Sequence, residues 1–171
     1  MNRTKKLTEM AMMIAFAVIC SFIKVWEMPQ GGSVALTMVP LLVASFRLGA
    51  VCGMITGGVY GVISLLIAGV VYHPASVLLD YILAFALVGT AGFFKGDEKG
   101  IIWGSITGVG GRFLSSLVSG GVIFAEYAPP GQNPWIYSLV YQATYMIPEL
   151  VICIAVLLFL YVKSPDFFKS K

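Results

Sequence analysis

Long apolar stretches, separated by short groups of Pro, Gly and charged residues, follow one another along the whole chain. Crossing the apolar core of a bilayer takes about 20 residues of α-helix. The pattern predicts an all-α integral membrane protein, a single domain over residues 1–171 with six transmembrane helices. We place these helices at about residues 8–26, 35–46, 49–70, 75–94, 101–124 and 137–162. The second is short, so it is either tilted or continuous through Arg47 and Gly49 with the third.

The composition agrees with a membrane protein. Hydrophobic residues make up 58% of the chain and charged residues 11%, whereas a soluble domain carries about 25% charged residues. The apolar stretch from Leu7 to Ile23 is too long for a cleavable signal and has no small-residue cleavage site behind it. We therefore expect it to remain as the first helix.

Basic residues orient the predicted bundle. All but Lys24 and Arg112 fall at alternate ends of the six predicted helices: Arg3, Lys5, Lys6, Arg47, Lys95, Lys99, Lys163, Lys169 and Lys171. Because Lys and Arg accumulate in cytoplasmic loops, both termini are predicted to be cytoplasmic. The outer face then carries three loops rich in Pro, Gly and aromatic residues, "MPQGGSV", "VVYHPAS" and "AEYAPPGQNPW". A ligand arriving from outside would meet these loops first.

Two charged residues lie inside predicted spans, where an ionisable group needs a partner or a water-filled cavity. Asp80 lies in "LLDYILAF" and Arg112 in "GGRFLSSLVSGG". One interpretation is an Asp80–Arg112 pair that ties two helices together. The other is that Asp80, nearer the outer surface, waits for a cationic or amidine-like ligand, and its shallower depth favours this role. Glu149, which follows Pro148, is interpreted as structural.

A tyrosine stripe lies on the last predicted helix. Tyr137, Tyr141 and Tyr145 are spaced by four residues, so they share one helical face, with Gln142 beside it. Aromatic rings with hydroxyl and amide groups suit a flat, polar heterocycle, because the rings stack on it and the polar groups bond its edge. The stripe and Asp80 together indicate a binding site for such a ligand.

Enzymatic chemistry is not indicated. The single histidine, His73, stands before Pro74 without the carboxylates or thiols of a metal site, and we expect neither a metal nor a cofactor. No phosphate-binding loop of the Walker type occurs, so energy for uphill transport must come from another subunit. Ala11 and Ala15 form a small-xxx-small pattern that allows close approach of another helix. That helix belongs either to such a subunit or to the protein's own bundle.

Four strings carry a resemblance to a known family: "MPQGGSV", "HPASVLLDYILAFALVG", "RFLSSLVSGGVIFAEYAPPG" and "PWIYSLVYQATYMIPE". In these strings the chain resembles the substrate-binding S components of thiamine-specific energy-coupling factor (ECF) transporters, over nearly its whole length. The resemblance implies six helices, one bound thiamine near the outer surface, and a place in a bacterial cytoplasmic membrane. It also implies a transmembrane coupling subunit and two cytoplasmic ATPases as partners, and no nucleic acid.

The resemblance also implies site residues. Asp80 and Tyr81 match the acidic–Tyr pair of the fourth helix, Phe124 the aromatic of the fifth, and Tyr137 the Tyr of the sixth. Ser116 stands where members commonly have His, and Gln142 where they have Asn. The full candidate binding site is Asp80, Tyr81, Ser116, Phe124, Trp135, Tyr137, Tyr141 and Gln142.

Two further regions take roles by the same resemblance. The loop Pro29, Gln30, Gly31, Gly32 and Ser33 would close over the ligand, and Ala11 with Ala15 would contact the coupling subunit. Thiamine fits the candidate site because its thiazolium is a permanent cation that Asp80 could balance. Two alternatives stay open: a related heterocycle in the same site, given Ser116 and Gln142, or a stand-alone proton-coupled carrier that uses Asp80 and Arg112 as a relay.

Overall fold

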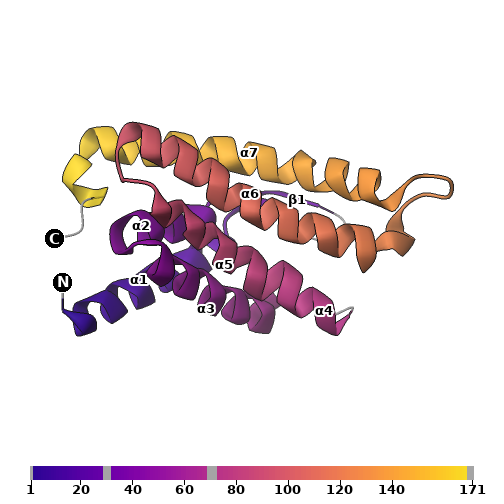
Figure 1. The fold of residues 1–171 in the computed structure, drawn as a ribbon, viewed down its shortest axis with the longest axis horizontal. Helices are drawn as coiled ribbons and strands as arrows, with labels where there is room; N and C mark the ends of the chain where they lie inside the picture. Colours follow the sequence, from indigo (N-terminus) through magenta and orange to yellow (C-terminus); the bar gives the residue numbers. More distant parts are fainter. Residues whose placement is uncertain (1, 29–31, 69–72, 169–171) are drawn as a thin grey trace.

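The computed structural model describes residues 2–28, 32–68 and 73–168, which form a bundle of long helices (Figure 1). The continuous helices are α1 (Arg3–Ser21), α2 (Met38–Leu48), α3 (Ala50–Ala68), α6 (Glu98–Val122) and α7 (Pro134–Lys163). Between α3 and α6, four short segments form one helical rod: α4 (Pro74–Ser76), the π-helix η1 (Val77–Leu83), α5 (Ala84–Val88) and the 3-10 helix η2 (Gly89–Phe93). Two 3-10 turns, η3 (Ala125–Tyr127) and η4 (Pro165–Phe168), precede and follow α7.

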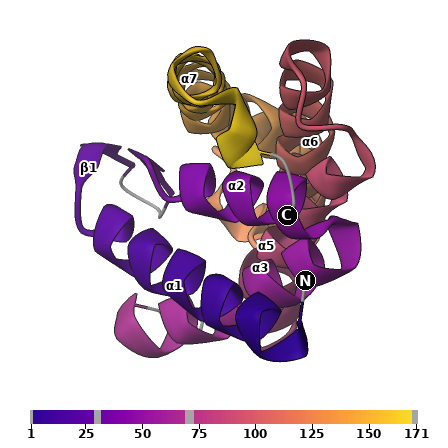
Figure 2. The same ribbon diagram turned by 90° about the vertical axis from the view of Figure 1, so that its left-hand side faces the viewer.

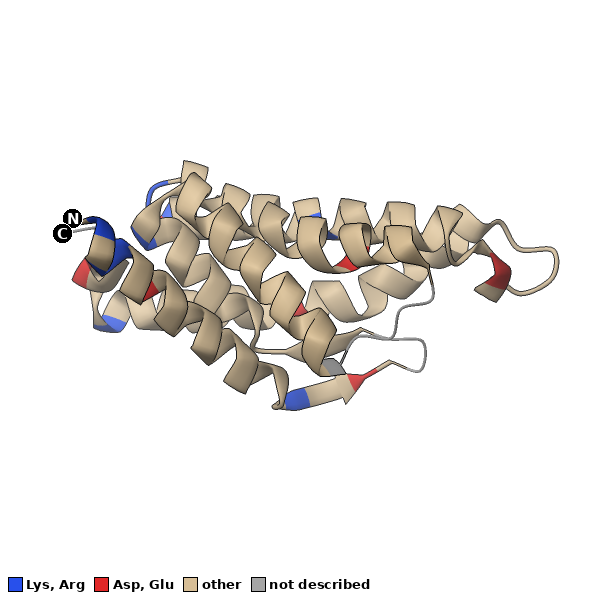
Figure 3. Ribbon diagram, turned by 90° about the horizontal axis from the view of Figure 1, so that it is seen from below, with Lys and Arg blue, Asp and Glu red and all other residues tan. Residues whose placement is uncertain are grey.

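The helices are arranged around α2, α3 and α5. Seen from one end, α6 and α7 lie together on one side of the bundle and α1 lies on the other (Figure 2). The two termini lie at the same end, and most of the Lys and Arg residues gather there (Figure 3). The arrangement agrees with the predicted clustering of basic residues at one end of the helices.

Four of the predicted spans match helices of the structure closely. Over the described residues, four segments are long and apolar enough to cross a membrane, namely Ala50–Ile67, Pro74–Phe93, Glu98–Val122 and Pro134–Lys163. The helix α2 is a shorter apolar helix, as the short second stretch predicted. Gly49, with a φ of 85°, separates it from α3, so the two are not one continuous helix.

The first predicted span, 8–26, is wrong at its end. The helix α1 stops at Ser21, and residues Lys24–Glu27 form strand β1, which pairs antiparallel with strand β2 (Ser33–Ala35). Lys24 forms an exposed 2.6 Å ion pair with Glu27 of the same strand. The run of apolar residues continues into this hairpin. Pairing of β1 with β2 satisfies the backbone hydrogen-bonding groups, so apolar side chains such as Val25 and Trp26 are as compatible with a strand as with a helix.

Side chains cap three of the helices. Asp97 accepts a 2.8 Å hydrogen bond from Gly100 N at the start of α6, and Asn133 accepts one of 2.9 Å from Trp135 N at the start of α7. His73 Nδ1 accepts a 3.1 Å bond from Ala75 N, so this histidine caps α4. Capping satisfies backbone N–H groups that have no partner within the helix.

Glycines allow α3 to lie directly on the rod that carries the candidate site. A Cβ atom at Gly57 would lie 2.0 Å from the carbonyl oxygen of Phe85, and one at Gly61 would lie 2.3 Å from that of Tyr81. Gly58 faces away, since its nearest neighbour would be 3.8 Å distant. The close contact fixes the backbone of η1, and with it the positions of Asp80 and Tyr81.

The end that holds both termini is tied together by Arg47, at the last turn of α2. Its guanidinium donates hydrogen bonds to the carboxylate of Glu9 on α1 and to the carbonyl of Phe167 on η4. It also lies over the Phe167 ring, 4.8 Å from the centroid. The neighbouring Phe168 is only 2% exposed and packs edge-on against Phe46. The last turn of the described chain therefore belongs to the core.

Candidate functional site

Asp80 lies on the π-helix η1 and faces α6. Ser119 Oγ donates a 2.5 Å hydrogen bond to Asp80 Oδ2, and Ser115 Oγ donates one of 2.6 Å to the carbonyl of Leu79. A carboxylate accepts at two oxygens, and Ser119 occupies one of them. Single turns of π-helix occur frequently at functional sites. The half-buried carboxylate thus has a fixed orientation and remaining capacity to bind a ligand.

Gln142 lies between α6 and α7 with both ends of its amide engaged. Its Nε2 donates a 3.3 Å hydrogen bond to the carbonyl of Ser116, and its Oε1 accepts one from the hydroxyl of Tyr145. Ser116 is itself buried, at 5% exposure. Ser138, one turn before Gln142, donates a 3.1 Å bond to the carbonyl of Leu117. These contacts hold α7 on α6 beside the candidate site.

The predicted tyrosine stripe is present on α7. The rings of Tyr137 and Tyr141 have centroids 6.1 Å apart, and those of Tyr141 and Tyr145 are 6.3 Å apart. Tyr137 and Tyr141 are half-buried, whereas Tyr145 is buried. The stripe therefore runs from an accessible end near the start of α7 to a closed end beside Gln142.

Three other aromatic candidates surround the same end of the bundle. Trp135, at 46% exposure, lays its ring on α6, where a Cβ atom at Gly121 would lie 2.6 Å from it. The ring of Phe124 contacts that of Tyr127, with centroids 5.8 Å apart and the ring planes tilted by 59°. Tyr81 follows Asp80 on η1 and is half-buried. The candidate residues thus come from η1, from α6 and the turn after it, and from α7.

Arg112 does not pair with Asp80, and the interpretation of a direct Asp80–Arg112 ion pair is wrong. Arg112 Nη1 instead donates a 3.0 Å hydrogen bond to Oε2 of Glu149 on α7, and the two side chains are only 12% and 2% exposed. The guanidinium also lies over the ring of Phe85, 4.7 Å from its centroid. The structural interpretation of Glu149 is confirmed, and Asp80 is left with a neutral partner.

The candidate gating loop is described only in part. Pro29, Gln30 and Gly31 lie outside the described residues, whereas Gly32 and Ser33 are described. Gly32 has a φ of 91°, and a Cβ atom there would lie 2.7 Å from the ring of Tyr145. This end of the loop therefore rests directly on the tyrosine stripe.

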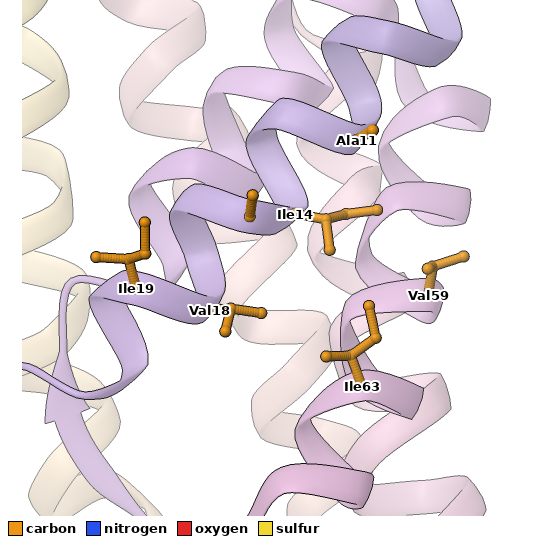
Figure 4. Close-up of a pocket in the computed structure, with 7 residues that line it drawn as sticks. Ala11, Ile14, Val18, Ile19, Val59 and Ile63 are labelled. Atoms are coloured by element: carbon orange, nitrogen blue, oxygen red, sulfur yellow. The ribbon is translucent and has the colours of Figure 1, made fainter.

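Ala11 and Ala15 are exposed on α1, on the side of the bundle away from α7. They line an apolar groove of about 600 Å³ between α1 and α3, together with Ile14, Val18, Ile19, Val59 and Ile63 (Figure 4). The two alanines are thus exposed in this groove and not buried against the protein's own helices. The groove leaves space for a side chain from another helix.

Over residues 2–28, 32–68 and 73–168, no group of three or more His, Cys, Asp or Glu side chains is placed to hold a metal ion. The polar groups that do converge are one carboxylate, one amide and several hydroxyls. Such groups bind an organic ligand through hydrogen bonds and charge, with aromatic rings on its faces.

Comparison with known proteins identifies the family. Residues 7–169 match the family described as "Thiamine transporter protein (Thia_YuaJ)". The chain belongs to this family. A relative in Bacillus subtilis (strain 168), the thiamine transporter ThiT, is 39% identical over 99% of this chain and 98% of its own length. The ThiT of Lacticaseibacillus paracasei is 28% identical over 95% of this chain and 90% of its own.

Solved structures share the fold of this thiamine transporter family member. ThiT from Listeria monocytogenes superposes with a TM-score of 0.88 at 24% identity, over 98% of both chains. The S component of a bacterial ECF transporter superposes with a TM-score of 0.67 at 20% identity, over 97% of this chain and 98% of the other. The chain is thus a multi-pass protein of the bacterial cell membrane with the S-component fold, and its family consists of transporters and not enzymes.

Sequence reasoning missed two residues of this transporter's candidate site, Ser115 and Ser119, and the burial of a third, Tyr145. Ser115 and Ser119 bond η1, and Tyr145 joins Gln142 to the hairpin. A signal for the serines was present, because the spacing of four in "SSLVS" places both on one helical face. Tyr145 was recognised as part of the stripe, but its burial could not be inferred without the position of β2.

Proposed function

We propose that this chain binds thiamine with high affinity at the outer face of the membrane and delivers it for import. In this proposal it is the substrate-specificity subunit of an ECF-type ABC transporter. The observation that carries the proposal is Asp80, an acidic group on a membrane-spanning rod, which bonds the neutral hydroxyl of Ser119 while Arg112 is bound to Glu149 instead. A carboxylate held by a neutral hydroxyl keeps its negative charge for a cationic ligand.

The candidate residues make different kinds of contact with thiamine in this proposal. Asp80 balances the thiazolium charge or accepts a hydrogen bond from the aminopyrimidine. The rings of Tyr81, Tyr137 and Tyr141, with Trp135 and Phe124, flank the two flat heterocycles, as cation–π and stacking contacts favour. Gln142 and Ser116 form the closed wall between α6 and α7.

The loop 29–33 closes the site in this proposal. Support comes from Gly32, whose contact with the ring of Tyr145 places the end of the loop on the stripe. Glycine tolerates the positive φ at this position and allows the backbone to approach the ring. Pro29, Gln30, Gly31 and Ser33 complete the loop.

The groove at Ala11 and Ala15 is proposed to receive a helix of the transmembrane coupling subunit. Small side chains permit close packing of helices within a bilayer. Two cytoplasmic ATPases would drive the complex, since a binding protein without a motor can only equilibrate its ligand. The proposal has six spans with both termini cytoplasmic, in keeping with the basic residues at the end that holds both termini (Figure 3).

The experiment that tests this function is a calorimetric titration of the purified protein in detergent. Thiamine is titrated first, followed by its isolated pyrimidine and thiazole halves. Saturable one-to-one binding of thiamine well below micromolar, with much weaker binding of the halves, is expected. Absence of heat with thiamine would overturn thiamine as the ligand.

One observation favours a second candidate, a related heterocycle such as a thiamine precursor or degradation product. The amide of Gln142 is already bonded to the Ser116 carbonyl and the Tyr145 hydroxyl, which limits its capacity toward a ligand. Competition of these compounds against thiamine separates the two candidates. Uptake measured with and without the ATPase subunits, and with a proton uncoupler, tests the stand-alone carrier in the same cells.

A further inference from the structure

Strand β2 contacts α7 at two points that are one helical turn apart. Directly before its first residue, Gly32 lies on the ring of Tyr145, so closely that a Cβ atom would be 2.7 Å from the ring carbons Cε1 and Cζ. At its end, the backbone N–H of Ala35 donates a hydrogen bond to the side chain of Glu149. Val34, between these points, is buried against Tyr145. The strand therefore follows α7 in the same direction and touches it at both ends.

Glu149 is a fixed point for the strand. Its Oε2 accepts a 3.0 Å hydrogen bond from Arg112 on α6, and Arg112 in turn lies on the ring of Phe85 on α5. Hydrogen bonds between charged groups are strong and set the orientation of both partners. The carboxylate that receives Ala35 is consequently held by two further helices and cannot follow a movement of the hairpin.

Tyr145 has a different connection. Its ring supports Gly32, but its hydroxyl donates to Oε1 of Gln142, whose Nε2 bonds the carbonyl of Ser116. One side chain thus touches the hairpin with its face and the candidate ligand site with its polar end. Any displacement of Gln142 by a ligand must be accommodated at this hydroxyl, because both groups are buried.

We propose that Tyr145 and Glu149 are positioning residues that link the candidate ligand site to the β1–β2 hairpin. Glu149 fixes the end of β2 on α7, and Tyr145 transmits the position of Gln142 to the start of the strand. The link to a ligand rests on the function proposed above. Coupling between two sites is reciprocal. If the bound ligand favours contact between β2 and Tyr145 by some factor, then loss of that contact must weaken ligand binding by the same factor.

The first test needs no ligand. Hydrogen exchange of the backbone amides of residues 33–35 is measured in the wild-type protein and in Gly32→Ala, which places a methyl group in the Tyr145 ring. The matched control is Gly49→Ala, because Gly49 also has a positive φ of 85° but nothing within 4 Å of an added Cβ atom. At least tenfold faster exchange in Gly32→Ala, with no change in the control, is expected.

Glu149→Gln tests the second contact by the same measurement, since it removes the ion pair with Arg112 while it keeps the shape of the side chain. Exchange at residue 35 is expected to rise by at least tenfold. If this variant fails to fold, Gly32→Ala and its control still decide the question. Unchanged exchange in Gly32→Ala would overturn the fixation of the strand.

The second test measures release of thiamine by stopped-flow competition. Gly32→Ala and Tyr145→Phe are expected to raise the dissociation rate at least tenfold, whereas Gly49→Ala releases thiamine as the wild type does. A purely structural role would lower the melting temperature without changing the release rate, and that result would overturn the link. Failure of the wild-type protein to bind thiamine would overturn the proposed function and the link together, but the exchange result would stand by itself.

Discussion

The hydroxyl of Ser119 donates a 2.5 Å hydrogen bond to Oδ2 of Asp80, and so joins α6 to the π-helix η1. The donor is neutral, whereas the other carboxylate of this region, Glu149, is bonded to the guanidinium of Arg112. The two acidic groups therefore differ in their capacity to bind a further charged group. Glu149 is neutralised within the bundle, and Asp80 keeps a charge that a cationic ligand can balance.

The replacement Asp80→Asn removes this charge but leaves an amide oxygen that can still accept from Ser119. Thiamine affinity in calorimetric titration is expected to fall at least tenfold, or about 1.4 kcal/mol. The control is Glu126→Gln, which makes the same charge change at an exposed residue of η3. Equal affinity in Asp80→Asn and the wild type would leave Asp80 with a structural role alone.

The replacement Gln142→Asn shortens the side chain by one methylene. It can then no longer reach both the Ser116 carbonyl and the Tyr145 hydroxyl, and one buried polar group loses its partner. We expect a loss of about 1–3 kcal/mol in unfolding free energy, seen as a lower melting temperature in detergent. Gln132→Asn, at an exposed position before α7, is the control and should melt as the wild type does. Equal melting of both variants would contradict the prediction.

Bulky residues at the α1 groove should separate binding from uptake. The double replacement of Ala11 and Ala15 by Trp fills the groove against Val59 and Ile63. Uptake of radiolabelled thiamine by cells is expected to be lost, while calorimetric affinity of the isolated protein stays within twofold of the wild type. Phe16→Trp, at a 52% exposed position of the same helix outside the groove, should preserve both. Full uptake by the double variant would argue against docking at this groove.

Two neighbouring glycines of α3 test the packing that positions η1. Gly57→Ala places a methyl group 2.0 Å from the carbonyl oxygen of Phe85, whereas Gly58→Ala meets nothing closer than 3.8 Å. Overpacking costs about 1–3 kcal/mol, but alanine in an open helical position gains about 1 kcal/mol over glycine. Thermal unfolding should therefore show Gly57→Ala less stable than the wild type and Gly58→Ala equal or more stable. The reverse order would contradict the close packing of Gly57 on the carbonyl of Phe85.

Hydrophobic pattern predicted the long helices because a bilayer requires about 20 apolar residues per span and a sequence displays such runs directly. The end of the first helix was predicted wrongly. Val25 and Trp26 are as compatible with a helix as with a strand, and only their pairing with residues 33–35 decides between the two. Local pattern holds no information about that pairing.

The candidate site was predictable in its residue types and less so in its contacts. Tyr137 and Tyr141 lie side by side on one face of α7, as their spacing of four residues indicated. The partner of Arg112 was not predictable, because the sequence offers both Asp80 and Glu149 at plausible depths and the choice depends on how η1 and α7 pack on α6. The π-helical form of η1 likewise depends on its contacts with α3 and α6.

The two hydrogen bonds of Arg47 form at different stages of synthesis. Arg47 joins Glu9 near the start of the chain to Phe167 near its end. Proteins are synthesised from the N-terminus, so α1 and α2 enter the membrane long before the third partner exists. Only after η4 has been made can Phe168 enter the core and Arg47 bond both partners. Arg47 can therefore bond Glu9 well before its second partner, Phe167, has been made.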